Sequence, residues 1–252
     1  MMSLSTKSLC TSFFLLLYNL LIPSIHAQTV AKDSLTVDSA YAYALHQYHA
    51  YLDPEPALYR GGQYVDYDYN LESGHPYFGE HQMRKGTVWY NGIFYEDLLL
   101  LHDLVKDLVV TNDPVNTYKI VLISDQVDRF TIEDHLFIRL RDSLNPSAPR
   151  NGFYEQLYKG RISLLKKEKK SIEDDLSSQE KGVQHYISST VSYYLKKGAV
   201  YYSVNNKSSL LYALKDRNKE IRKFIRKNSL SIRKDTENTL LKVVAWYDGD
   251  NH

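Results

Sequence analysis

The sequence predicts an α+β protein: a curved, antiparallel β-meander with one helix near the N-terminus and two amphipathic helices near the C-terminus packed on it. Two observations predict this class. Short segments rich in β-branched and aromatic residues follow one another from residue 85 to residue 204, separated by tight polar turns. Helical periodicity is found before and after this region rather than between its segments, which favours an antiparallel sheet.

Residues 1–27 have the organisation of a secretory signal peptide. Lys7 supplies a positive charge, Phe13–Ile22 forms a short apolar core, and Ala27 occupies the small-residue position before a cleavage site. This core is shorter than the roughly 20 residues of a spanning helix, and an uncleaved N-terminal anchor is the alternative. Cys10, the single cysteine, precedes the core, whereas a lipoprotein cysteine would follow it. We therefore predict cleavage after Ala27 and a cysteine-free single domain over residues 28–252.

A helix is predicted over Asp38–Tyr51. Asp38 can cap its N-terminus, and aromatic and apolar residues recur along it at three- and four-residue spacing. The two prolines of Asp53–Pro56 end this helix. An extended segment is predicted over Gln63–Asn70. Leu71–Arg84 is predicted to be a long loop, because it contains glycine, proline and histidine without periodicity.

The predicted sheet begins with a hairpin at Asn91-Gly92, since both residues tolerate the positive φ angles of a type I′ turn. Roughly eight to ten strands are expected in all. They cover Thr87–Tyr90, Ile93–Asp97 with its continuation Leu98–Leu101, Leu104–Val110, Tyr118–Ile123, Val127–Thr131, Leu136–Arg141, Phe153–Tyr158, Arg161–Lys166, Val183–Leu195 and Ala199–Val204. A helix over residues 96–108 is the competing interpretation of the leucine-rich run. The charge-dense segment Lys166–Lys181 is predicted to be a solvated excursion.

Two amphipathic helices are predicted to close the chain, over Lys207–Asn228 and Asp235–Tyr247. The first has leucine, isoleucine and phenylalanine on one face and basic residues over much of the rest. The second can be capped by Asp235 and ends before Gly249. Packing of both apolar faces on the sheet is favoured over insertion of the first helix into anionic lipid, because the sheet needs an apolar cover.

Charge is unevenly distributed along a chain that is nearly neutral overall. Residues 28–150 contain 18 acidic and 10 basic side chains, whereas residues 151–252 contain 12 acidic and 20 basic ones. Neutralisation of one half by the other is the favoured interpretation, and an anionic partner such as lipid headgroups or a polymer is the alternative. A nearly neutral exported chain gives no reason to expect nucleic-acid binding. After the signal peptide, the sequence predicts no transmembrane segment.

The most suggestive polar group lies in the predicted loop. His75, Glu80 and His81 could supply the three ligands of a zinc site with an open position for water, and His102 could join them. Their spacing differs from that of helical zinc-protease motifs, and the proline and glycine between them exclude a helix. Ordinary loop histidines that bond to the backbone are the simpler explanation.

Oxygen-bearing side chains alternate over Asp66–Glu72, as they do at the start of a calcium-binding loop. Leu71, however, stands where an EF-hand loop has glycine, and the alternation also fits a strand with one solvated face. We therefore expect no dedicated calcium site, and no cofactor is predicted. The sequence also has no phosphate-binding glycine loop, dinucleotide fingerprint or nucleophile elbow.

Several segments carry a family resemblance. The Leu58–Tyr64 segment, the GHPYF run at Gly74–Phe78, the Trp89-Tyr90 hairpin and the closing segment Lys215–Asp248 together resemble a group of uncharacterised exported proteins of Gram-negative bacteria. The similarity covers most of the chain after the predicted signal peptide. It implies an exported, single-domain product in the periplasm or at the outer membrane, and it supplies no catalytic residues.

Three hypotheses about function follow from the sequence. The leading one is a non-enzymatic binding or scaffold domain whose partner is an envelope protein or an apolar ligand; the 22 tyrosines suit such a recognition surface as well as a half-buried sheet. The second is a half-barrel carrier of an apolar ligand, lined by Leu98–Leu101, Ile120, Leu122 and Phe137, an analogy that rests on architecture alone. The third is a metal-dependent hydrolase that uses the histidine-containing loop.

Overall fold

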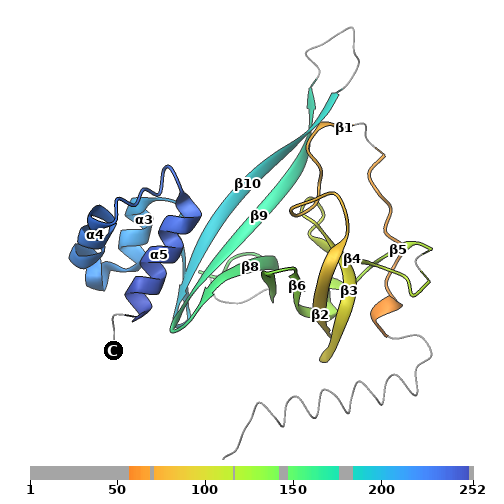
Figure 1. Cartoon of the computed structure of the whole chain (residues 1–252), viewed down its shortest axis with the longest axis horizontal. Helices are drawn as coiled ribbons and strands as arrows, with labels where there is room; N and C mark the ends of the chain where they lie inside the picture. Colours follow the sequence, from red (N-terminus) through yellow and green to blue (C-terminus); the bar gives the residue numbers. More distant parts are fainter. Residues whose placement is uncertain (1–56, 69–70, 116, 142–146, 176–183, 250–252) are drawn as a thin grey trace, which may run out of the picture. The chain divides into compact units, whose positions relative to one another are not determined.

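The structure is a computed structural model that describes residues 57–68, 71–115, 117–141, 147–175 and 184–249. All of them belong to one compact unit of the chain. The predicted signal peptide and the predicted helix Asp38–Tyr51 lie outside the described residues. Within these ranges the chain forms one large mixed sheet and three α-helices (Figure 1). None of the described helices is long and apolar enough to cross a membrane.

The sheet joins two meanders. Its eleven strands are β1 (Leu71–Ser73), β2 (Arg84–Tyr90), β3 (Ile93–Asp103), β4 (Leu108–Asn112), β5 (Lys119–Val121), β6 (Val127–Ile132), β7 (His135–Leu140), β8 (Gly152–Lys159), β9 (Ile162–Asp175), β10 (Gln184–Lys197) and β11 (Val200–Ser203). Their order is β1-β10-β9-β8-β7-β6-β2-β3-β4-β5, with β11 also paired to β10. Pairing of β2 with β6 therefore links the meander β2–β5 to the meander β6–β11.

The prediction of an entirely antiparallel sheet is wrong at one edge. β1 pairs with β10 in parallel, through Leu71 opposite His185 and Ser73 opposite Tyr186. β1 is not part of a hairpin. It belongs to the segment predicted as a long loop, and it occupies a stretch of the β10 edge that β11 leaves open.

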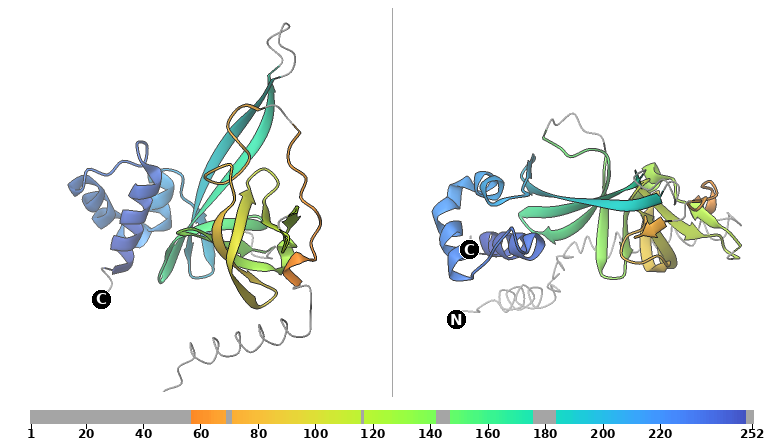
Figure 2. Two further views of the ribbon diagram at one scale, coloured as in Figure 1. Left: turned by 45° about the vertical axis from the view of Figure 1, so that its right-hand side comes forward. Right: turned by 90° about the horizontal axis from the view of Figure 1, so that it is seen from above.

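The sheet curls although it does not close. Four strands lie between β3 and β9, which in a flat sheet would separate these two strands by about 24 Å. The backbone N–H of Lys170 in β9 nevertheless donates to the carbonyl of Leu104, directly after β3, at 3.1 Å. Figure 2 shows the twist of the strands in two further views. The hydrogen bond between Lys170 and Leu104 thus requires the sheet to be curved, as the sequence predicted.

One hydrophobic core lies inside the curl. It gathers side chains from β2, β3, β4, β6, β7 and β8 together with Leu58 of the 3₁₀ helix η1 (Ala57–Tyr59). The rings of Phe130 and Phe137 stack with centroids 4.7 Å apart, and Phe153 meets Phe130 edge-on at 5.2 Å. Tyr90, Phe130 and Phe153 are fully buried. Large aromatic side chains therefore fill this space.

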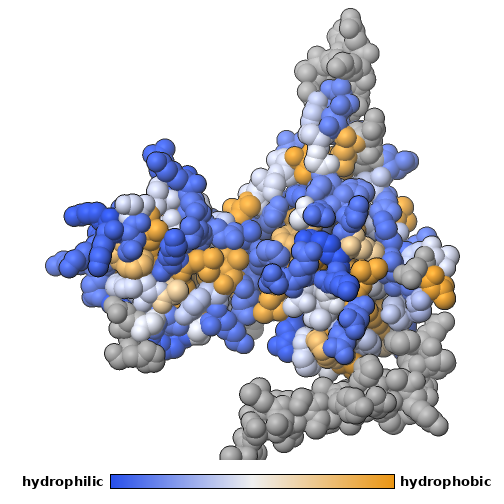
Figure 3. All heavy atoms as spheres, in the orientation of Figure 1, coloured by the Kyte–Doolittle hydropathy of each residue, from blue (hydrophilic) through white to orange (hydrophobic). Residues whose placement is uncertain are grey.

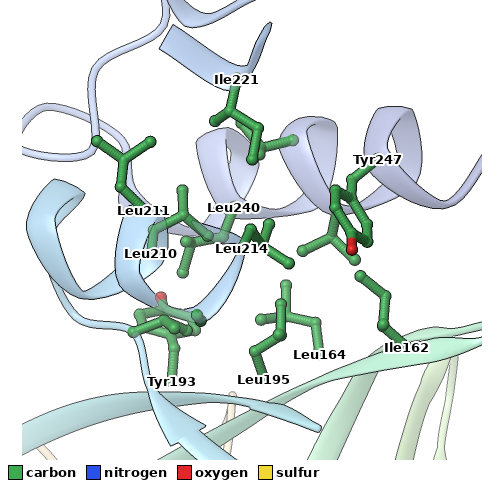
Figure 4. Close-up of a cluster of buried hydrophobic side chains, with 14 of the residues drawn as sticks. Ile162, Leu164, Tyr193, Leu195, Leu210, Leu211, Leu214, Ile221, Leu240 and Tyr247 are labelled. Carbon is green, nitrogen blue, oxygen red and sulfur yellow. The ribbon is translucent and has the colours of Figure 1, made fainter. Parts of the chain in front are cut away.

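The three helices form a second core with one end of the sheet. They are α3 (Lys207–Ala213), α4 (Asn218–Lys227) and α5 (Thr236–Gly249). Leu164 of β9 and Leu195 of β10 are fully buried beneath them (Figure 4). Ile221 of α4 and Leu240 of α5 belong to the same cluster. The prediction that the closing helices pack on the sheet is confirmed for α3 and α5, which contact β11, β8 and β9, whereas α4 packs mainly on α3 and α5.

A single helix over Lys207–Asn228 was wrongly predicted. The 3₁₀ turn η3 (Lys215–Arg217) separates α3 from α4, and Leu214 before it has φ −110° and ψ 40°. Asp216 in this turn accepts hydrogen bonds from Lys197 Nζ at 2.7 Å and from the hydroxyl of Tyr247 at 2.5 Å. These tertiary bonds fix the turn to β10 and α5. They outweigh the helical propensity of Lys215–Arg217, because propensity is only a weak preference.

Other sequence predictions have mixed outcomes. The Asn91-Gly92 turn is confirmed, with φ angles of 51° and 79°. The leucine-rich run forms β3 rather than the competing helix, and the next strand begins only at Leu108. The segment after Lys166 was predicted to be a solvated excursion, but β9 continues to Asp175 and pairs with β10 over 14 residues. Backbone ladder bonds hold this segment in the sheet although its side chains are mostly polar.

Candidate functional site

Two adjacent sequence motifs and a lysine from a strand much later in the chain meet at one pocket. The pocket has a volume of about 400 Å³ and is lined by Asp66, Tyr67, Leu71, Gly74, Pro76, Tyr77, His81 and Lys119. The first three come from the acidic and tyrosine-rich segment, the next four from the histidine-containing loop, and the last from β5. We call it the Asp66 pocket.

The acidic segment reaches the pocket because it runs alongside β5. The N–H of Tyr64 donates to the carbonyl of Lys119 at 2.8 Å, and the N–H of Val121 donates to Gly62 at 2.9 Å. The backbones approach so closely that a Cβ atom on Gly61 would lie 1.8 Å from the carbonyl oxygen of Val121. Glycine at position 61 is therefore a requirement of this pairing.

The histidine-containing loop is fixed across the end of β3. The N–H of Phe78 donates to the carbonyl of His102, and the N–H of Leu104 donates to Pro76, both at 2.9 Å. From the other side, Lys170 Nζ of β9 donates to the carbonyls of His75 at 3.0 Å and Tyr77 at 2.6 Å. The loop is thus held between β3 and β9, where the curl of the sheet brings these strands together.

A buried carboxylate organises the wall of the pocket. Asp103 is completely buried, and its side chain accepts hydrogen bonds from the hydroxyls of Tyr64 at 2.9 Å and Tyr67 at 2.9 Å. It also accepts from the backbone N–H groups of Val105 and Lys106, each at 2.9 Å. Burial, followed by the bonds to Tyr77 and the Asp103 charge, raises the pKa of Tyr64 far above its ordinary value. Asp103 therefore holds the hydroxyls of Tyr64 and Tyr67 in fixed positions.

A second carboxylate faces the pocket itself. Asp66 accepts from Lys119 Nζ at 2.7 Å and from the hydroxyl of Tyr77 at 3.0 Å. Partial burial alone raises the pKa of Asp66, but the bonds from Lys119 and Tyr77 outweigh it and leave the pKa below the ordinary value. Burial raises the pKa of Tyr77 to about 12. At neutral pH the pocket thus contains a carboxylate and a neutral phenol in contact, with Lys119 Nζ bonded to the same carboxylate.

The structure brings together two of the three predicted metal ligands. The rings of His75 and His81 lie edge-on with centroids 6.0 Å apart, and His75 Nδ1 accepts from the N–H of Tyr77 at 3.2 Å. Burial and the charge of Lys170 lower the pKa of His75. Glu80 is exposed, and the described residues contain no group of three or more His, Cys, Asp or Glu side chains placed to hold a metal ion. Zinc binding therefore stays a prediction without a preformed ligand set.

His102, considered as an additional ligand, lies elsewhere. Its ring is buried among Phe130, Phe137 and Phe153, with Nε2 3.2 Å from Asp107 Oδ1. Lys167 Nζ donates to the other oxygen of Asp107 at 2.7 Å.

This buried network has shifted pKa values. Burial lowers the pKa of His102 despite the neighbouring Asp107. Burial alone would raise the pKa of Asp107, but its bonds to His102 and Lys167 lower it to about 2. Nδ1 of His102 is buried and has no hydrogen-bond partner among the described residues. Asp107, in the turn before β4, also accepts from the N–H of Phe153 in β8 at 3.2 Å, so this network joins β3, β8 and β9 around the core.

Sequence reasoning singled out Asp66 and His81 but missed Asp103 and Lys119. Asp103 did leave a signal, because His102-Asp103 is a polar pair inside an otherwise apolar run of leucines. Charged residues are rarely buried unless they are paired or hydrogen-bonded, so such an interruption indicates a buried polar network. Lys119 gave no signal, since its contact with Asp66 depends on the pairing of the acidic segment with β5.

Comparisons of the chain with protein-family models, with curated proteins and with solved structures gave no match.

Proposed function

We propose that this protein is a non-enzymatic binding domain, exported to the periplasm or the outer membrane, and that the Asp66 pocket receives a small neutral ligand rich in hydroxyl groups. The observation that carries the proposal is the set of polar side chains fixed before any ligand arrives. Tyr67 is held by Asp103, and Tyr77 is held by Asp66. Pre-positioned groups reduce the ordering cost of binding.

The volume of the pocket supports a small ligand. About 400 Å³ lies within the usual range for small-molecule sites, roughly 300–1,000 Å³. The lining combines aromatic rings with a few polar groups, which is also typical of such sites.

The charges of the pocket favour a neutral ligand. Asp66 and Lys119 form an ion pair at 2.7 Å and so balance one another. The pair still offers acceptors on the carboxylate and donors on the ammonium group. A ligand hydroxyl can donate a hydrogen bond to the Asp66 carboxylate and accept one from Lys119. A purely anionic or cationic group cannot do both. A sugar unit presents several hydroxyls of this kind together with an apolar ring face for tyrosine.

The carrier hypothesis has less support. Leu100, Leu101, Ile120, Leu122 and Phe137, which were expected to line an apolar cavity, are all packed into the cores with at most 3% of their surface exposed. Leu98 is partly buried against one of these cores, and Leu99 is 43% exposed. A binding domain with a polar pocket uses these residues only for stability.

The proposal is tested with the full exported chain and a panel of neutral mono- and disaccharides, using a shift in thermal unfolding as the readout. Glucosamine and sialic acid serve as cationic and anionic counterparts. At least one neutral sugar should stabilise the protein in a saturable manner, and Asp66→Asn should weaken its binding at least fivefold.

Asp128→Asn is the matched control. Asp128 is 50% exposed and Asp66 is 53% exposed, and each forms an ion pair with one basic side chain. The control should bind as the unmodified protein does. Absence of any saturable shift over the panel, or equal weakening by both substitutions, would reject the proposed pocket. Export is tested separately by the N-terminus of the product recovered from the cell envelope, which should begin at Gln28.

A further inference from the structure

A second groove lies on the helices, and it shares no lining residue with the Asp66 pocket. Two hollows of about 320 and 340 Å³ have Lys207, Ile225 and Leu230 in common and therefore adjoin. Arg222 and Arg226 of α4 also line the first hollow, and Arg233 lines the second. We call this the α4 groove.

The rim of the α4 groove is cationic. Lys207, Arg222, Arg226 and Arg233 are all exposed, and no Asp or Glu lines either hollow. None of these four side chains forms an ion pair with any described residue, although two other arginines of the basic half do: Arg161 pairs with Asp248, and Arg217 pairs with Glu220. Among the residues that the structure describes, no carboxylate of the acidic half therefore pairs with this rim, although composition favoured neutralisation of one half by the other.

The floor of the groove is apolar. Ile225 and Ile232 belong to the core beneath the helices with 6% and 7% of their surface exposed, and Leu230 packs against the same core. Figure 3 shows that hydrophilic residues cover much of the visible surface of the helices, with hydrophobic patches among them. Ser229 adds a hydroxyl to the lining.

The geometry points to an anionic amphiphile as the occupant: a phosphate-bearing head on the cationic rim and an alkyl chain along the floor formed by Ile225, Leu230 and Ile232. Arginine is well suited to the head, because its guanidinium can donate two parallel hydrogen bonds to a phosphate. Arg222 is already oriented by a bond from its Nε to Asn218 Oδ1 at 2.7 Å. An alkyl chain that covers the floor removes apolar surface from water.

The probe is octyl phosphate below its critical micelle concentration, titrated into the full chain in a calorimeter. Inorganic phosphate lacks the chain, and octyl glucoside has the chain without the charge. Octyl phosphate should bind at least tenfold more tightly than either, and its affinity should fall as the salt concentration rises.

The double variant Arg222→Gln/Arg226→Gln should bind octyl phosphate at least tenfold more weakly. Lys219→Gln/Lys223→Gln is the matched control, since it removes the same charge from exposed positions of the same helix that do not line the groove. The control should change the affinity less than twofold. Leu230→Ser should weaken the binding of octyl phosphate and leave the binding of inorganic phosphate unchanged.

Three results would overturn the assignment. The first is that octyl phosphate does not bind to the unmodified chain. The second is that inorganic phosphate binds as tightly as octyl phosphate, which would remove any role for the apolar floor. The third is equal weakening by both double variants, which would show a diffuse charge effect rather than a site. Each double variant is first compared with the unmodified chain by circular dichroism. All four substituted residues are exposed, so native spectra are expected.

Discussion

Replacing Asp103 with alanine should destabilise the protein by about 2–4 kcal/mol. The substitution removes the acceptor of the Tyr64 and Tyr67 hydroxyls, and leaving a buried donor without a partner costs about 1–3 kcal/mol. Tyr64 is 5% exposed and cannot turn its hydroxyl to water, whereas Tyr67 is half-buried and loses less. The backbone N–H groups of Val105 and Lys106 also lose their acceptor, but these residues are less buried and can bond to water instead. One large loss, at Tyr64, and smaller losses at the other three donors give the expected range.

The free energy of unfolding is measured by urea titration with circular dichroism. Tyr67→Phe alone should cost about 1 kcal/mol, and the double variant Asp103→Ala/Tyr67→Phe should cost less than the sum of the single variants, because both remove the same bond. Asp128→Ala, which breaks only an exposed pair with Arg141, should cost at most about 1 kcal/mol. If Asp103→Ala cost no more than Asp128→Ala, or if its effect added fully to Tyr67→Phe, the buried network would not organise the pocket.

Burial lowers the pKa of His102, so below pH 6.5 the unfolded chain binds a proton that the folded chain does not. Stability should therefore fall from pH 7 to pH 5 by up to about 1.4 kcal/mol per pH unit, and His102→Gln, which keeps a donor toward Asp107, should reduce that slope in urea titrations. Leu164 is fully buried between β9 and the helices. Leu164→Ala should cost about 2–5 kcal/mol in the same assay.

Two controls make these outcomes decisive. His75 also has a lowered pKa, so the His102 comparison is made in a His75→Gln background. A pH slope that His102→Gln leaves unchanged would contradict the assigned burial. Leu99→Ala serves as the control for Leu164→Ala because Leu99 is 43% exposed, and similar losses for the two variants would contradict the helix-covered core.

Local patterns predicted the elements of the fold better than their connections. Asn91-Gly92 forms the expected turn because its backbone angles depend on two adjacent residues. The parallel pairing of β1 with β10 joins residues more than a hundred positions apart, and nothing in the composition of Leu71–Ser73 indicates it. Similarly, the break at η3 depends on the contacts of Asp216 with Lys197 and Tyr247 rather than on the helix sequence.

The residues of the candidate site were also easier to predict from the sequence than the contacts between them. Of the residues named from the sequence, Asp66 and His81 line one pocket, whereas His75 and Glu80 do not line it. The candidate zinc site assumed that His75, Glu80 and His81, which are close in sequence, would also converge in space. In the structure Glu80 is exposed, and the partner of Asp66 is Lys119, from a strand more than fifty residues later.

The most direct test of the Asp66 pocket is to see which tyrosines respond to a neutral sugar selected by the unfolding assay. In spectra of the full chain with isotope-labelled tyrosine rings, the signals of Tyr67 and Tyr77 should shift in a saturable manner while that of Tyr212, on α3, stays unchanged. Signals are assigned by single substitutions to phenylalanine. Shifts confined to Tyr212 and its neighbour Tyr202, or uniform small shifts of all tyrosines, would contradict a ligand site at Asp66.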